Sequence, residues 1–190
     1  MIEKEFYIGS NVCVVRDTKK SLYGLADKND NLITPIKYNK YNVLSSKEVC
    51  FFEDQKCGVL DLNGNIIVPF LYDCIAKSEK SNIFFGRLNN KYGIINIKNN
   101  KKSDIIYDDI DIFKGSEIIK VKKNEKYGLL NSELELVLPI IFDDIVQSFV
   151  NIVFTVFLNK EASKIVFSET ENKIIISKED KRKLIKNIIG

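Results

Sequence analysis

The fold is decided by residues 57–73, CGVLDLNGNIIVPFLYD, because the pattern of this stretch recurs along the chain. A glycine that follows Tyr or Cys occurs four times, at spacings of 34, 35 and 35 residues. Self-similarity at a fixed period is typical of repeat proteins, in which each unit buries its apolar face against its neighbours. These glycines are Gly24, Gly58, Gly93 and Gly128.

Other positions stay in phase with the glycine, without insertion or deletion. In three units a proline stands eleven residues after the glycine. In all four units an aromatic residue stands fourteen residues after the glycine, and Asp or Asn follows it directly. The prolines are Pro35, Pro69 and Pro139, and the third unit has Asp104 instead. The aromatic residues are Tyr38, Tyr72, Tyr107 and Phe142, and the residues after them are Asn39, Asp73, Asp108 and Asp143.

We therefore interpret residues 1–190 as one repeat array made of several units. A fifth unit is degenerate, because Ser163 takes the glycine position and the proline and Tyr-Asp landmarks are missing. Terminal repeats are often atypical, since they close an array against water. The units span about 11–45, 46–80, 81–115, 116–150 and 151–177, and a C-terminal cap spans 178–190.

Each unit is predicted to form three short antiparallel strands. The first is an apolar run rich in Val, Ile and Phe, the second begins at the glycine, and the third carries the proline. Between the second and third, Asn63-Gly64 predicts a type I′ hairpin turn, and we expect Glu133-Leu134 to use another turn. The first strands are predicted at 12–16, 49–52, 83–85, 118–122 and 152–157.

The landmark residues have structural interpretations. Isolated glycines in strands indicate a bulge or a close backbone approach. The proline cannot donate a ladder hydrogen bond, so it should end or bend the third strand. The aspartates are expected to cap their own backbone in Asx turns, and a connection of about ten residues should follow each of them.

Composition excludes several classes of site. The net charge of +3 is too small to indicate nucleic-acid binding by itself. The chain has no histidine and no Cys-x-x-Cys pair, so we predict no metal, cofactor or catalytic residues. The N-terminus lacks a signal peptide, which predicts a cytoplasmic protein with free thiols. We interpret Cys13, Cys50, Cys57 and Cys74 as small buried hydrophobes.

The repeat columns resemble the WG-repeat (tryptophan–glycine) family of bacterial proteins. The match is best at residues 57–73, and it extends well over residues 12–150 and weakly to 178. The chain has no tryptophan, and Tyr23, Cys57, Tyr92 and Tyr127 hold its position. The resemblance implies an all-β repeat scaffold used for interaction, without catalytic residues to transfer.

We expect the units to stack as a solenoid-like array, with a propeller-like ring as the alternative. Propeller blades usually have four strands and about 40 residues, and this unit is shorter. The tail begins with a predicted helix cap at Ser177, and Leu184, Ile185, Ile188 and Ile189 should share one apolar face. That face either covers the end of the array or docks on a partner or membrane.

The predicted function is non-catalytic protein binding or scaffolding, which includes inhibition of another protein. Specificity should come from the variable segments, above all 98–103, where Lys101-Lys102-Ser103-Asp104 replaces an apolar strand. The alternatives are a single-stranded nucleic-acid module built on aromatic and lysine residues, and a carbohydrate or small-ligand module. The chain has no membrane span, and an open edge strand could support dimerisation. The candidate partner-binding residues are Lys98, Lys101, Lys102, Lys122 and Lys123, and the other variable segments are 77–82, 114–117 and 159–164.

Overall fold

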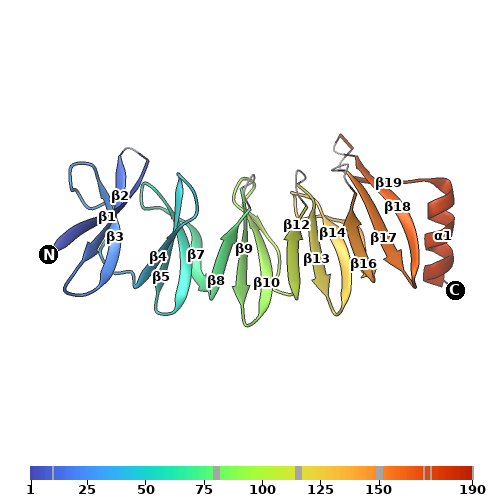
Figure 1. Ribbon diagram of the computed structural model, residues 1–190, viewed down its shortest axis with the longest axis horizontal. Coiled ribbons are helices and arrows are strands. Elements are labelled where there is room, and N and C mark those ends of the chain that lie inside the picture. The colour runs from blue at the N-terminus through green and yellow to red at the C-terminus, as the bar shows by residue number, and fades with distance from the viewer. Residues whose placement is uncertain are drawn as a thin grey trace. The chain divides into compact units, whose positions relative to one another are not determined.

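In the computed structural model the chain forms five antiparallel sheets and one C-terminal helix (Figure 1). The structure describes residues 1–9, 11–78, 82–113, 117–148, 152–168, 170–171 and 173–189. The chain divides into two compact units. The first comprises Met1–Lys77 and Gly86–Asn89, and the second comprises Ser78–Phe85 and Asn90–Gly190.

The sheets follow one another in chain order. The first contains β1 (Ile2–Ile8), β2 (Val12–Asp17) and β3 (Leu22–Asp27). The second contains β4 (Lys40–Val43), β5 (Glu48–Glu53), β6 (Lys56–Asp61) and β7 (Ile66–Tyr72). The third contains β8 (Cys74–Lys77), β9 (Ile83–Leu88), β10 (Lys91–Asn96) and β11 (Lys101–Lys102). The fourth contains β12 (Asp109–Ile112), β13 (Ile119–Lys123), β14 (Lys126–Leu130) and β15 (Leu136–Phe142). The fifth contains β16 (Asp144–Gln147), β17 (Val153–Leu158), β18 (Glu161–Ser168) and β19 (Lys173–Ile176), and α1 (Lys178–Ile189) follows.

A fourth strand joins the three that the sequence predicts. The segment after each aromatic-acidic pair was expected to be a connection, but it pairs with the first apolar strand of the next unit, as in β12 with β13. Only Asp73 separates β7 from β8, and only Asp143 separates β15 from β16. Each of these sheets therefore combines residues from two successive sequence repeats.

The first sheet lacks such a donor strand, and β1 takes its place. This strand was not predicted, because six of its seven residues are exposed. It pairs with β2 along its length, with an irregularity between Lys4 and Phe6. On the other side of the sheet, isolated bridges tie the following segment to β3, at Tyr23–Tyr38 and Ala26–Leu32.

The hairpin turns differ from the prediction. Asn63-Gly64 is not a type I′ turn, because only Gly64 has a positive φ, of 84°. Leu134 takes the equivalent left-handed position with a φ of 62° while Glu133 has no positive φ, so Glu133-Leu134 forms no type I′ turn, as expected, but resembles Asn63-Gly64. Two-residue loops with two positive φ values, as type I′ turns require, instead join the first and second apolar strands. They are Asp54-Gln55, Asn89-Asn90, Asn124-Glu125 and Asn159-Lys160.

The repeat glycines allow a close approach between strands, as predicted. A Cβ built on Gly58 would lie 2.7 Å from the ring of Phe70, and one on Gly128 would lie 2.8 Å from the carbonyl oxygen of Leu138. The register between β6 and β7 shifts between the pairs Val59–Val68 and Cys57–Tyr72, around Pro69. The proline therefore lies at an irregularity, and the strand continues through it.

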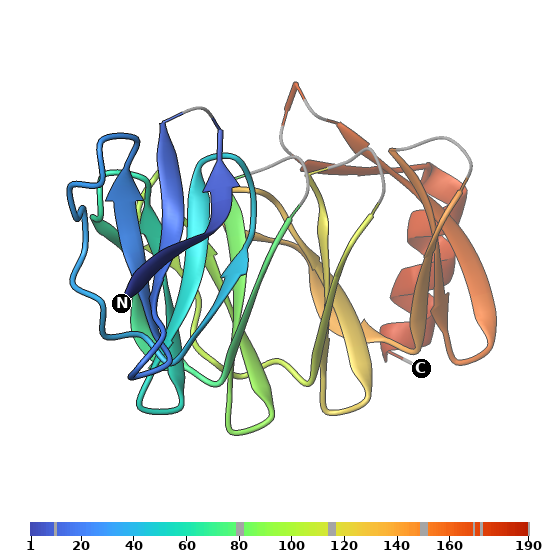
Figure 2. The same cartoon turned by 60° about the vertical axis from the view of Figure 1, so that its left-hand side comes forward.

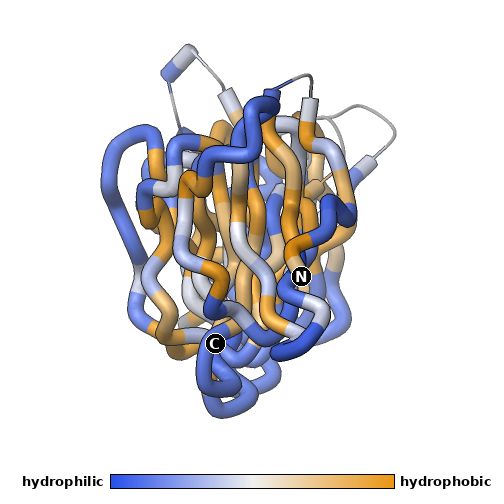
Figure 3. Tube along the Cα trace, turned by 90° about the vertical axis from the view of Figure 1, so that its left-hand side faces the viewer, coloured by the Kyte–Doolittle hydropathy of each residue, from blue (hydrophilic) through white to orange (hydrophobic). Residues whose placement is uncertain are grey.

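The core consists of the residues that alternate inward along these strands, and hydrophobic stretches follow the strands while hydrophilic ones gather at the turns (Figure 3). The residues after the repeat glycines are fully buried. The cysteines are unpaired, and Cys74 is exposed, so the expectation of four buried cysteines holds for three. The pKa of Cys50 is raised by its hydrogen bond to Cys57 and by burial.

Candidate interaction surface

The repeated aspartates connect one sheet to the hairpin of the next. Asp108 accepts a hydrogen bond from the backbone N–H of Asn124, at 2.7 Å from Oδ2, and forms an ion pair with Lys91. Both contacts hold the pKa of the Asp108 carboxyl below its usual value, the ion pair more strongly. The prediction of a structural role fits this arrangement, but the expected Asx turn was wrong, because the carboxylate caps a different hairpin.

The same contact recurs in the neighbouring units. Asp73 pairs with Lys56 and caps Asn89, and Asp143 pairs with Lys126 and caps Asn159. The pKa of each carboxyl is lowered, first by its lysine and then by the backbone N–H. Asp73, Asp108 and Asp143 are called the corner aspartates below. They contact the type I′ turns, which fits the predicted structural role.

Asx turns do occur, but three residues after each repeat glycine. The Asp61 Oδ1 atom accepts hydrogen bonds from the backbone N–H groups of Asn63 and Asn65, at 2.9 and 2.8 Å. The residues in this column are Asp27, Asp61, Asn96 and Asn131. The change from acid to amide coincides with a new contact, because the side chain of Asn96 also donates from Nδ2 to the carbonyl oxygen of Ser132, at 2.7 Å.

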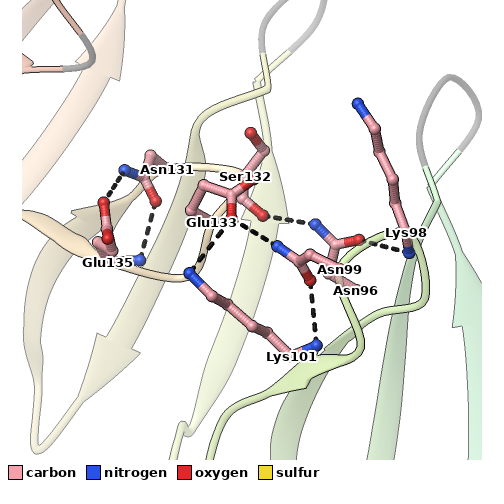
Figure 4. Close-up of polar contacts among 8 residues, drawn as sticks. All are labelled: Asn96, Lys98, Asn99, Lys101, Asn131, Ser132, Glu133 and Glu135. Atoms are coloured by element: carbon pink, nitrogen blue, oxygen red, sulfur yellow. Dashed lines mark hydrogen bonds and ion pairs between the residues drawn. The ribbon is translucent and has the colours of Figure 1, made fainter.

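A ladder of polar contacts joins the β10–β11 turn to the β14–β15 turn (Figure 4). Asn99 donates from Nδ2 to Oε2 of Glu133 at 2.7 Å, and Lys101 lies 3.2 Å from the same oxygen. Asn96 is only 4% exposed, so its two hydrogen bonds are formed away from water. The turn ladder, defined as Asn96, Asn99, Lys101, Ser132 and Glu133, fixes the backbone of both turns.

The three lysines of residues 98–103, the segment most expected to give specificity, have different roles in the structure. Lys101 belongs to the ladder, whereas the exposed side chain of Lys98 extends away from it (Figure 4). Lys102 lies in the two-residue edge strand β11, opposite Ile95, and is exposed. Lysine on an edge strand discourages pairing with another chain, as proline does on β7 and β15. The charged residues that interrupt the third repeat therefore have a structural interpretation.

Lys122 and Lys123 do not lie beside these lysines. Lys123 pairs with Lys126 at the start of β14, whereas the ladder contacts the turn beyond Leu130, at its end. Five residues of strand place the two groups roughly 15 Å apart. Lys122 forms an ion pair with Glu125 at 2.8 Å, which raises its pKa. The predicted lysines therefore form two separate groups.

The other variable segments give less structural evidence for a binding surface. Residues 79–81 and 114–116 lie outside the described part of the chain, so two of the predicted segments are only partly described. The landmark aromatic residues are all buried, with Tyr38 stacked on Phe51 at a centroid distance of 4.4 Å. They cannot stack on bases. Exposed aromatic side chains among the described large hydrophobic residues are those of Phe6 and Tyr7, on β1.

The C-terminal helix begins as predicted. Ser177 Oγ accepts a hydrogen bond from the backbone N–H of Asp180 at 3.0 Å, and donates to its carboxylate at 2.6 Å. The helix lies beside β18 (Figure 2), and Leu184 is buried in the core of unit two. Ile185 and Ile188 are 45% and 57% exposed, so the helix buries only part of the predicted apolar face, and the side chain of Ile189 lies outside the described residues.

A hollow of about 340 Å³ lies beside one flank of this helix. It is lined by Ser163, at the former glycine position, and by Glu179, Asp180 and Lys183 of α1, among other residues. Across the described ranges, no group of three or more acidic or cysteine residues is arranged to hold a metal ion. The described helices also include none of the length and apolarity needed to cross a bilayer.

The model of the WG containing repeat matches residues 58–92 and 92–127. These two segments match the WG-repeat family, and together they span residues 58–127, less than half of the chain. The matched residues cover the third sheet and parts of the second and fourth sheets. They also include two corner aspartates, Asp73 and Asp108. No curated protein sequence matches the chain.

Solved structures are similar to this chain at low identity. Hsv2 of Kluyveromyces lactis is 12% identical over 94% of this chain, with a TM-score of 0.41. A eukaryotic initiation factor is 9% identical over 92% of it, with a TM-score of 0.45. The chain spans 65% and 53% of the lengths of these two proteins.

Proposed function

We propose that this WG-repeat module is a non-catalytic protein-binding scaffold, whose contact surface includes the β10–β11 turn. One observation carries the proposal: the turn ladder hydrogen-bonds this turn to the β14–β15 turn while Lys98 extends outward from it (Figure 4). A surface fixed before binding loses little conformational entropy on association. The turn therefore has the rigidity that a specific binding surface needs.

The ion pairs and hydrogen bonds of the recurring ionisable residues favour a binding function for this protein over a catalytic one. Each corner aspartate is paired with a lysine and a backbone N–H, and the pKa of its carboxyl is lowered. A general base at neutral pH would need a raised carboxyl pKa. The corner aspartates, which recur in the repeat, are thus suited to stabilising the fold and not to acting as general bases.

The partner that this turn fits is an acidic protein surface. Lys98 and Lys102 are exposed, and neither forms an ion pair within the described residues. Asn100, also exposed, lies between them with a φ of 56° and adds amide donors and acceptors. Rim lysines of this kind act mostly on association rate and specificity, so affinity should fall with salt.

The test compares two charge reversals of equal size. K98E/K102E should weaken capture of the native partner from lysate, whereas K122E/K123E, about 15 Å away along the strands, should leave it nearly unchanged. Capture is measured by mass spectrometry, with nuclease and without it, and the melting temperature of each variant is recorded. Equal capture by both variants and wild type would refute this location. Loss of every partner on nuclease treatment would instead favour nucleic-acid binding.

The proposal also includes a compartment and an oligomeric state. Four unpaired cysteines fit a reducing compartment, and we propose the cytoplasm. We propose a monomer, because the edge strand β1 carries Glu3, Lys4 and Glu5 and an irregularity between Lys4 and Phe6, and both features oppose strand pairing. Sedimentation velocity tests this, and a concentration-dependent dimer would contradict it.

A further inference from the structure

The two flanks of α1 differ in charge. Successive helical residues turn by about 100°, so positions three and four apart share a flank. Glu179, Asp180 and Lys183 line the hollow beside β18, and Lys183 pairs with Glu179 at 3.2 Å. Within the described helix both acidic residues line this hollow, with the side chain of Glu179 80% exposed at its rim.

The opposite flank is basic and apolar. It carries four basic side chains, all exposed, and none of them forms an ion pair in the part of the chain that the structure describes. Ile185 and Ile188 lie among them, 45% and 57% exposed, while Leu184, at the edge of this flank one turn before Ile188, is buried in the core. This basic flank is defined as Lys178, Lys181, Arg182, Ile185, Lys186 and Ile188.

We propose that the basic flank of α1 docks on an anionic lipid membrane. Interfacial helices of this kind place apolar side chains at the acyl boundary and lysines at the headgroups. The aliphatic stems of Lys181 and Lys178 can lie along the two isoleucines while their ammonium groups reach phosphate. Negative charge on the membrane complements a flank that contains no acidic residue among those described.

The size of the flank favours a membrane over a protein partner. Twelve helical residues span about 18 Å, and one flank about 10 Å wide offers roughly 200 Å². A stable protein interface buries about 800 Å² on each partner. A lipid surface needs no shaped groove and accepts a narrow apolar ridge. Two isoleucines and four basic residues predict weak, reversible binding that depends on salt.

The test uses the full chain and vesicles of phosphatidylcholine, with and without phosphatidylserine. Wild-type protein should co-sediment with the anionic vesicles only, and less at high salt. K181Q/R182Q should reduce partitioning at least about tenfold, since each basic residue near an anionic surface contributes about 1 kcal/mol. The matched control K164Q/K183Q removes two charges on the sheet-facing side and should change partitioning less than about threefold.

A second pair of variants separates lipid binding from folding. I185S/I188S should keep the wild-type melting temperature, because both side chains are exposed, yet lose most vesicle binding. Equal partitioning of the wild-type protein into neutral and anionic vesicles would overturn the proposal. Equal losses of vesicle partitioning in K181Q/R182Q and K164Q/K183Q would also overturn it. So would an absence of vesicle binding combined with capture of an acidic protein through Lys181 and Arg182.

Discussion

The substitution of Asn96 by Asp tests the turn ladder directly. Asn96 donates from Nδ2 to the carbonyl oxygen of Ser132 at 2.7 Å, and accepts the backbone N–H of Lys98 at Oδ1. An aspartate keeps the acceptor but turns the donor into a second oxygen facing the carbonyl. With 4% of the residue exposed, water cannot restore the lost hydrogen bond.

The expected loss follows from these contacts. Removing one partner of a buried hydrogen bond costs about 1–3 kcal/mol, and the facing oxygens add to it, so we expect about 2–3 kcal/mol in all. For a chain of this size that is a fall in melting temperature of about 5–10 °C. Urea unfolding measures the free-energy loss and thermal unfolding measures the melting temperature, both followed by circular dichroism. Asp61→Asn, the reverse change where no second turn is contacted, should have a smaller effect.

The loss in N96D should also depend on pH. Burial and the facing carbonyl raise the pKa of the new carboxyl in the folded state, so the folded protein binds the proton more tightly than the unfolded chain. The loss is therefore largest at neutral pH and shrinks as pH falls toward the ordinary carboxyl pKa of about 4, because a protonated oxygen can donate to Ser132. Wild-type stability in N96D at neutral pH would refute the ladder's contribution.

Three further changes test the repeat. Gly58→Ala places a Cβ 2.7 Å from the ring of Phe70 and should destabilise by about 1–3 kcal/mol in urea unfolding; an unchanged midpoint would contradict the close approach. Gln55→Gly, at a φ of 67°, should stabilise by about 1 kcal/mol, whereas Asn63→Gly, where φ is not positive, should destabilise; the opposite order would exclude the assigned turns. The pKa of each corner aspartate is lowered, so the stability that these residues provide is present above about pH 4 and lost as pH falls below it. Replacing all three by Asn should flatten that part of a melting-temperature profile, and an unaltered profile would show that they contribute little.

The sequence predicts well those features that leave a periodic pattern. The strand at 12–17 and its equivalents contain short apolar runs, and the glycine column marks where two strands approach too closely for a Cβ. The fourth strand was missed because β12, Asp109–Ile112, alternates charged residues with isoleucines over only four residues. Such a short, half-exposed segment has the composition of a connection, and only its pairing with β13 makes it a strand.

The turns show why local signals can mislead. Asn-Gly is the strongest short hairpin signal, yet Asn63-Gly64 is part of a longer loop closed by Asp61. Loop type depends on which residues pair on either side, and Glu53 pairs with Lys56 directly across Asp54-Gln55. The recurrence of Asn at 89, 124 and 159, again 35 residues apart, was a signal that could have located the two-residue turns.

The candidate site was predicted only in part. The run of Lys101 and Lys102 was correctly recognised as a departure from the repeat, but its charge serves an ion pair with Glu133 and an edge strand. Contacts between turns 34 residues apart cannot be read from composition. The fourth strand also removes the strand count as an argument against a propeller-like ring, so the choice between a solenoid and a ring stays a prediction.

The one-residue junctions at Asp73 and Asp143 bear on how such a chain can change its length. Because each sheet after the first takes its first strand from the preceding repeat, the cut point of a gene duplication within this part of the chain hardly matters. A tandem copy of any 35-residue window supplies one donated strand and three resident ones, and so inserts one complete sheet without leaving an orphan strand. Recombination can therefore lengthen or shorten the array in whole steps, whereas a truncation inside a window leaves the next sheet without its first strand.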